Sequence, residues 1–198
     1  MANFDRLAEQ GKPFFLRCDQ RTILRRFPGL EADAGHLYPR FCGERFAVDR
    51  ETGDVTGPDG QKAGPAETLA IFDWLCHQDA PVRLAGEWRT TNTLPGCGQS
   101  SPDDAKLNGA WGTRFSGKLP ELRRACAALG GAPFPVGDAA AELPVFDGFR
   151  AVFQFWEGDD EFPPNSQILY SDNFVGGFSA EDRVVAGDIL ITAIKSKM

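Results

Sequence analysis

Residues 149–156 read Phe-Arg-Ala-Val-Phe-Gln-Phe-Trp, and an apolar side chain occupies every second position. A period of two is typical of a β-strand, because successive side chains of a strand point to opposite faces. One face is fully apolar and carries Phe149, Ala151, Phe153 and Phe155. Residues 166–171 follow after a short loop and are the natural antiparallel partner. The pattern therefore predicts a hairpin with at least one face packed on a core.

Helical spacing of apolar residues, at three and four positions apart, predicts several helices. They lie in a helical N-terminal segment, 1–30, at 65–77, at 120–129, and after Ser179, where Ser-x-x-Asp has the form of a capping box. Short strands are predicted at 36–41, 44–49 and 85–91, between turn-rich stretches. Residues 92–117 form a long, irregular excursion.

Together these elements predict an α+β fold. We expect an antiparallel sheet of about four to six strands with three or four packed helices. A chain of 198 residues is short enough for one domain with its own core, so we expect a single domain over 1–198. Its last part, 149–197, combines the hairpin with a C-terminal helix.

The overall composition is that of an ordinary globular protein, with 42% hydrophobic and 25% charged residues and a mean hydropathy of −0.30. No apolar run approaches the ~18 residues that a membrane-spanning helix needs. The first residues lack the basic and then apolar pattern of a signal peptide. We therefore expect a cytoplasmic protein without a membrane partner.

A net charge of −7 and an isoelectric point near 4.9 argue against nucleic-acid binding. That binding draws most of its affinity from clustered Lys and Arg side chains that displace counterions from phosphates. The basic cluster of the chain is short and has the spacing of one solvated helix face: Arg17, Arg21, Arg25 and Arg26. No nucleic-acid partner is predicted.

The five cysteines are widely spaced and include no Cys-x-x-Cys pair, so neither a zinc site nor a disulfide framework is predicted. Three of them, Cys18, Cys76 and Cys126, lie on apolar faces of predicted helices and are expected to be reduced, buried thiols. Cys97 lies in a Gly-rich loop, where a nucleophile could stand, but a catalytic thiol needs a base and the chain has two histidines, His36 and His77. No metal site and no cofactor are predicted.

Acidic charge is concentrated in residues 131–178. This stretch contains one base, Arg150, and eight acids, so its local balance of −7 equals that of the whole chain: Asp138, Glu142, Asp147, Glu157, Asp159, Asp160, Glu161 and Asp172. Four of the acids fall in the loop 157–165, which joins the two strands of the hairpin. A surface of one sign attracts an oppositely charged partner.

We therefore predict that the acidic loop is the contact surface of a non-catalytic binding or accessory protein. Its partner is a protein or a small molecule, and a cationic partner would suit the charge of the loop. The candidate residues are Trp156, Glu157, Asp159, Asp160, Glu161, Phe162 and Asp172. Several alternatives remain open. A solvated connector and a hard-cation site both fit the acids, although their spacing is not that of an EF-hand.

Two further alternatives would make the protein an enzyme. Paired-carboxylate catalysis would need two acids that converge from different elements, for instance Glu157 and Asp172. An enzyme of unknown reaction could instead hold its site in a cleft between the loop 157–165 and the segment 92–112.

The sequence of residues 153–172, FQFWEGDDEFPPNSQILYSD, resembles the C-terminal half of a domain-of-unknown-function family, number 3786 in that series. The likeness extends to the helix at 65–77, to the Leu-Pro-Gly turn at 94–96 and to the helix end at 129–131. Members of the family are chiefly proteins of anaerobic bacteria and archaea. The resemblance implies no reaction and no functional residues.

Overall fold

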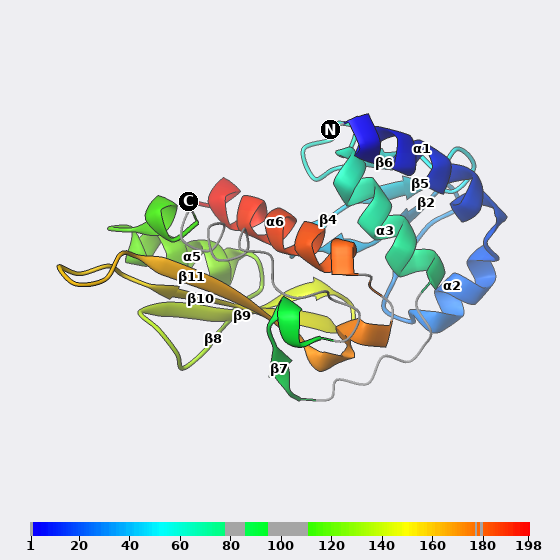
Figure 1. The fold of residues 1–198 in the computed structure, drawn as a ribbon. Coiled ribbons are helices and arrows are strands. Elements are labelled where there is room, and N and C mark those ends of the chain that lie inside the picture. The colour runs from blue at the N-terminus through cyan, green and yellow to red at the C-terminus, as the bar shows by residue number, and fades with distance from the viewer. Residues whose placement is uncertain (1, 78–85, 95–110, 177, 179) are drawn as a thin grey trace.

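The computed structural model describes residues 2–77, 86–94, 111–176, 178 and 180–198. Helices and antiparallel sheets are both present, which confirms the α+β class (Figure 1). The strands of the described residues form three sheets rather than one. Their orders are β1-β2-β5-β6, β7-β11-β10-β9-β8 and β3-β4.

The five-stranded sheet contains the predicted hairpin. Its strands are β7 (Trp88–Arg89), β8 (Ala132–Pro133), β9 (Ala139–Phe146), β10 (Phe149–Trp156) and β11 (Asn165–Ser171). The antiparallel pairing of β10 with β11 aligns Phe153 with Ile168 and Trp156 with Asn165, so the predicted hairpin is confirmed. On its other side β10 pairs with β9, a strand that the sequence did not indicate. The central position of β10 explains why Val152 and Gln154, on its second face, are buried as well.

The other two sheets contain the strands predicted at 36–41 and 44–49, together with two short strands at 31–32 and 55–56 that the sequence did not indicate. They comprise β1 (Glu31–Ala32), β2 (His36–Tyr38), β3 (Arg40–Phe41), β4 (Glu44–Arg45), β5 (Ala47–Asp49) and β6 (Val55–Thr56). Pro39, which has no N–H to donate, divides β2 from β3. The turn between β3 and β4 requires glycine at position 43, because its φ is +80° and a Cβ there would lie 2.4 Å from the Leu129 carbonyl oxygen.

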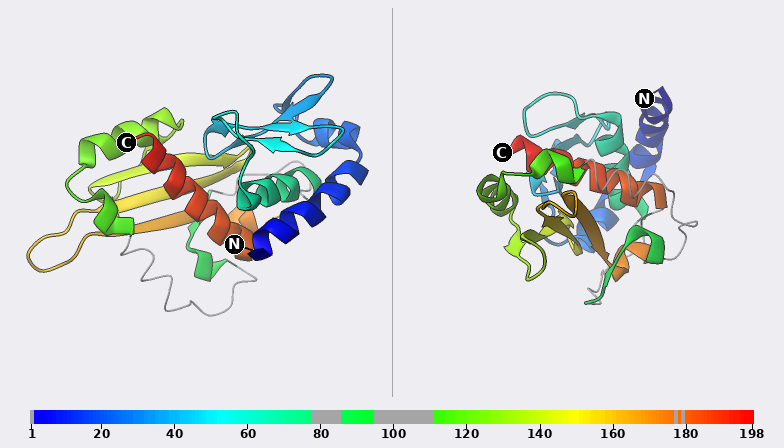
Figure 2. Two further views of the ribbon diagram at one scale, coloured as in Figure 1. Left: turned by 90° about the horizontal axis from the view of Figure 1, so that it is seen from above. Right: turned by 60° about the vertical axis from the view of Figure 1, so that its left-hand side comes forward.

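Most helices occupy the predicted regions, but residues 111–115 are helical although the excursion 92–117 was predicted to be irregular. Those with defined bounds are α1 (Ala2–Arg17), α2 (Gln20–Arg26), α3 (Pro65–His77), α5 (Leu119–Ala128) and α6 (Ala180–Ser196). Helix α1 packs on α3, and α6 runs along the five-stranded sheet (Figures 1 and 2). Gly187 permits a close approach of α6 to β11, because a Cβ at this position would lie 2.5 Å from the Tyr170 hydroxyl. The predicted capping residue, Ser179, lies outside the described residues.

Aromatic stacking joins the N-terminal elements to the five-stranded sheet. The ring of Trp74, on α3, stacks on Phe27 after α2 at 4.2 Å and on Phe146 of β9 at 4.9 Å. Phe146 also stacks on Phe41 of β3 at 4.3 Å. All four side chains are buried and belong to one continuous hydrophobic cluster.

Among the described residues, no helix combines the length and the apolar character needed to cross a bilayer.

The thiols differ in burial. Cys126 is buried, as predicted, and Cys42 is buried too, whereas Cys18 and Cys76 are half-buried at the edge of the core. The prediction of full burial is therefore confirmed for Cys126 and wrong in degree for the other two, which lie near the ends of α1 and α3. Cys97 lies outside the described residues.

Thiol reactivity should follow this burial. Burial raises the pKa of Cys126 to about 12, so almost none of it is thiolate at neutral pH. We expect a maleimide to modify Cys126 at least ~100-fold more slowly in the native protein than in the unfolded chain. Peptide mass spectrometry of a labelling time course measures this ratio. Rapid native labelling of Cys126 without unfolding would contradict the packing of α5.

Candidate functional site

The acidic loop connects β10 to β11 and projects beyond the end of the five-stranded sheet (Figure 2, left). Trp156 pairs with Asn165 at its base, and Trp156 is half-buried there. Since β10 and β11 are long and paired along most of their length, the ends of the loop are held by a rigid part of the sheet.

Glu157 anchors the base of this loop. Its carboxylate accepts hydrogen bonds from the Ser116 hydroxyl and from the Gly117 N–H, the latter at 2.9 Å to Oε1 and 3.1 Å to Oε2. Its own N–H donates to Asp138 Oδ2 at 2.7 Å. Glu157 is therefore engaged within the protein and is the least available of the predicted acids for a partner.

Asp159 shapes the turn. Its Oδ1 accepts the N–H groups of Glu161 at 2.9 Å and Phe162 at 2.7 Å, and its N–H donates to the Phe162 carbonyl oxygen at 2.9 Å. These backbone N–H donors lower the pKa of Asp159, because they stabilise its charged form. The loop is thus a hydrogen-bonded turn that holds the backbone of residues 159–162.

The remaining side chains of the turn point into solvent. Asp160 and Glu161 are exposed, and their carboxylates make no hydrogen bond or ion pair with any other described residue. Phe162 is 67% exposed, more than any other large hydrophobic residue in the described part of the chain. We call Asp160, Glu161 and Phe162 the acidic tip.

Asp172 lies far from the acidic tip. It directly follows β11, at the end opposite the loop, and lies seven positions after Asn165. At about 3.3 Å for each residue of a strand, the two ends are roughly 23 Å apart. The structure therefore does not bring Glu157 and Asp172 together, and the paired-carboxylate alternative does not hold for these two acids.

Asp172 lies in a different environment from the acids of the loop. Its N–H donates to the Glu87 carbonyl oxygen at 3.0 Å, and its Oδ1 is enclosed without a hydrogen-bond partner among the described residues. The described start of the excursion, Thr91–Thr93 in the short 3-10 helix η1, follows β7, which pairs with the same end of β11. These residues are therefore remote from the loop, and residues 95–110 of the predicted cleft lie outside the described residues.

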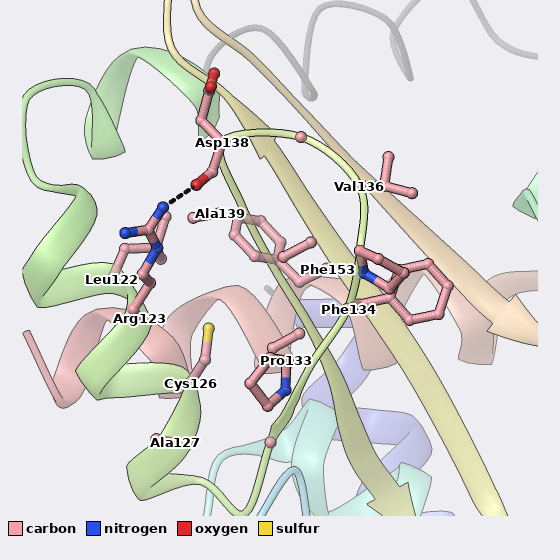
Figure 3. Close-up of a pocket in the computed structure, with 15 residues that line it drawn as sticks. Leu122, Arg123, Cys126, Ala127, Pro133, Phe134, Val136, Asp138, Ala139 and Phe153 are labelled. Atoms are coloured by element: carbon pink, nitrogen blue, oxygen red, sulfur yellow. Dashed lines mark hydrogen bonds between the residues drawn. The ribbon is translucent and has the colours of Figure 1, made fainter.

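A cavity of about 300 Å³ lies between α5 and the segment that leads into β9 (Figure 3). Most of its wall is apolar and includes Leu122, Cys126, Phe134, Val136 and Phe153. Its mouth is polar, because the Arg123 guanidinium donates to the Asp138 carbonyl oxygen (Figure 3). Sequence reasoning missed this cavity since it did not predict β8 and β9.

The cavity and the acidic loop share one residue. Asp138 lines the cavity, and its carboxylate also accepts the N–H of Glu157. The thiol of Cys126 is held protonated by burial, and the residues that line the cavity include no histidine to act as its base. The cavity therefore has the character of a small apolar binding pocket.

No cluster of three or more His, Cys, Asp or Glu side chains that could hold a metal ion occurs within the described ranges. In the loop, Glu157 and Asp159 direct oxygens to N–H donors rather than to a common point. The arrangement favours a turn that presents side chains over a turn that encloses a cation.

Substitutions at Asp159 should separate its charge from its hydrogen bonds. Asp159→Asn keeps an oxygen acceptor for the N–H groups of Glu161 and Phe162, so the free energy of unfolding should change by less than ~0.5 kcal/mol. Asp159→Ala removes the acceptor and should cost about 0.5–1.5 kcal/mol. Urea denaturation of both variants measures the difference, and equal losses would show that the turn does not depend on this carboxylate.

The comparisons with known proteins give one match. The family described as Domain of unknown function (DUF3786) matches residues 22–193, which is most of the chain, and this confirms the resemblance seen around the hairpin. No curated protein and no solved structure matches the chain.

Proposed function

The chain belongs to this family, and we propose that it acts as a non-catalytic binding or accessory protein whose contact surface is the acidic tip. One observation carries the proposal: on a hydrogen-bonded turn, a phenylalanine that is 67% exposed follows two acids whose carboxylates have no partner among the described residues, and two prolines follow it. The proposal retains the cytoplasmic location expected from the sequence.

The exposure of Phe162 is unusual for its residue type. A fully buried phenylalanine gains roughly 1.5–3 kcal/mol over an exposed one, and a partner that covered this ring would recover part of that gain. Aromatic side chains are common among the residues that dominate binding energies at interfaces. The tip therefore offers a compact apolar anchor.

The turn lowers the cost of using that anchor. Because Asp159 already holds the N–H groups of Glu161 and Phe162, little backbone freedom remains to be lost when a partner binds. Asp160 and Glu161 add two negative charges beside the ring. The matching partner has an apolar recess bordered by Lys or Arg side chains, and its association should weaken as salt rises.

The geometry gives less support to an enzyme. Glu157 and Asp172 do not converge, and the apolar cavity of Figure 3 pairs its thiol with no base among its lining residues. Both features agree with a protein that functions by binding a partner rather than by catalysis.

A photo-crosslinking experiment tests the proposal. Benzoylphenylalanine replaces Phe162 in the full chain, which is then irradiated in an extract of the source organism. We expect a discrete adduct that weakens when Asp160→Asn and Glu161→Gln are added and when salt is raised to about 0.5 M. The same probe at Phe14, which is 38% exposed and remote from the loop, is the matched control.

The proposal fails if position 162 gives no adduct beyond the Phe14 control. It fails equally if the adduct at 162 forms with the same yield when both acids are neutralised, because the charges would then play no part in recognition.

A further inference from the structure

A second cavity, of about 410 Å³, lies beside the base of the acidic loop. Its lining comes from the helical segment 111–115, the start of α5 and the end of α6, and consists of Arg114, Phe115, Lys118, Glu121, Lys195 and Met198. It adjoins the loop because the intervening Ser116 and Gly117 hold the carboxylate of Glu157. Sequence positions up to 84 residues apart thus meet in one recess.

Positive charge dominates this cavity. The side chains of Arg114, Lys118 and Lys195 form no ion pair or hydrogen bond within the described residues. The single acid of the lining, Glu121, lies 3.5 Å from Arg124, outside the cavity.

Three neighbouring cations with no carboxylate partner among the described residues stand out in a chain with 28 acids and 21 Lys and Arg residues. Several other cations of the described structure lie against carboxylates, as Lys12 does with Asp54, Arg45 with Glu31 and Lys197 with Glu44. Lys195 also complements the negative end of the α6 dipole, but that effect explains one of the three cations and not their convergence.

Two other features of the cavity suit an anionic molecule. The first turn of α5 begins at its edge, and the backbone N–H groups of a helix N-terminus carry partial positive charge. Phe115 forms a fixed apolar wall, because it is 1% exposed and packs edge-on against Phe153 at 5.5 Å and Phe155 at 6.2 Å. Met198, 39% exposed, adds apolar surface.

We propose that this cavity binds a small molecule that carries two or more negative charges on phosphoryl or carboxylate groups. The cations bind those groups, and Met198 contacts the body of the molecule above the apolar floor that the buried Phe115 supports. This site is separate from the acidic tip and does not depend on the function proposed for it. Its volume falls in the range of small-molecule sites.

The net charge of the protein favours a small anion over an acidic protein. An acidic macromolecule would approach a surface with a net charge of −7 and would be repelled over much of its contact area. A small anion is affected chiefly by charges within about one Debye length, roughly 8 Å at physiological salt, where the three cations outnumber Glu121.

Isothermal titration calorimetry with the full chain tests the proposal, with inorganic pyrophosphate and citrate as probes. We expect saturable binding of at least one probe at a single site. Lys118→Ala combined with Lys195→Ala should weaken it at least tenfold, since the loss of one hydrogen bond to a charged group already weakens binding by roughly that factor. The matched control is Arg17→Ala with Arg21→Ala, which removes two exposed cations from the α1–α2 region and should change the affinity less than about threefold.

The outcomes separate the alternatives. Preference for pyrophosphate assigns the site to phosphoryl groups, and preference for citrate assigns it to polycarboxylates. The proposal is overturned if neither probe binds at concentrations up to about 10 mM, if the control loses as much affinity as the double variant, or if a peptide of residues 157–165 binds the cavity and the small probes do not. Phe162→Ala should leave probe binding intact, so failure at this site is distinguishable from failure at the acidic tip.

Discussion

Truncation of Phe153 to alanine is expected to lower the free energy of unfolding by about 3–5 kcal/mol. The side chain is fully buried on β10, the central strand of the five-stranded sheet, and Phe115 packs edge-on against it. The variant loses the transfer free energy of the ring, and the space left behind cannot collapse because strands flank it on both sides. Phe153 also lines the cavity in Figure 3, which the truncation would enlarge.

Equilibrium denaturation in urea, followed by tryptophan fluorescence, measures this loss. Phe155→Ala should behave similarly, since Phe155 is equally buried and packs on the same Phe115 ring. The matched control is Phe162→Ala, where the ring is 67% exposed and the change should stay below ~0.5 kcal/mol. A loss below about 1 kcal/mol at both Phe153 and Phe155 would contradict the observed facing of β10.

The hairpin could be predicted from sequence because large apolar side chains occupy alternate positions of its first strand. Phe153 and Phe155 alternate with Gln154, and that alternation survives in the structure as opposite faces of one strand. The burial of side chains along β9 alternates, and more regularly than along β10, but its sequence gives a weaker strand signal. Its first three residues are alanines, which are weakly apolar, and it contains Pro144, a residue that is rare inside strands.

Pro144 is tolerated in β9 for a local reason. It lies opposite Arg150, next to the register shift between Phe149 and Arg150 where the ladder is irregular. Proline is found in sheets at such irregular positions because the missing N–H costs least there. The residue pattern of one strand cannot predict such an irregular position, since the irregularity arises from the pairing of two strands.

The division of the strands into three sheets could not be predicted from the sequence either. The segments 36–41 and 44–49 were predicted as strands, but which strands pair depends on contacts between residues far apart in the chain. Phe41 illustrates the point. Its strand, β3, follows Pro39 and is not part of the four-stranded sheet, and its ring stacks on Phe146, more than one hundred positions later.

For the candidate site, sequence analysis located the loop but not the roles within it. Asp159, Asp160 and Glu161 look alike in sequence, yet Asp159 holds the turn while the other two face solvent. Glu157 is occupied by Ser116 and Gly117, about forty residues earlier. The cationic cavity depends in the same way on the meeting of α5 with α6, and no local spacing of basic residues marks it.

Trp74→Ala is expected to lower the free energy of unfolding by about 3–5 kcal/mol, an effect as large as that at Phe153. The indole is fully buried and stacks between Phe27 and Phe146, so it connects α2, α3 and β9. Its Nε1–H has no hydrogen-bond partner among the described residues. Trp74→Phe should therefore cost less than about 1.5 kcal/mol, because it keeps aromatic stacking and removes a buried donor whose desolvation was not compensated.

The same pair of variants tests whether the chain is one domain. If 1–198 unfolds as a unit, Trp74→Ala should shift a single transition, with the same midpoint by far-ultraviolet circular dichroism and by fluorescence, as Phe153→Ala should. Two separated transitions in Trp74→Ala would show that the elements before α5 and the five-stranded sheet fold independently and that this aromatic stack merely joins them. If Trp74→Phe lowers the free energy of unfolding as much as Trp74→Ala does, the indole N–H must have a hydrogen-bond partner in solution. Aromatic stacking would then not account for the contribution of Trp74 to stability.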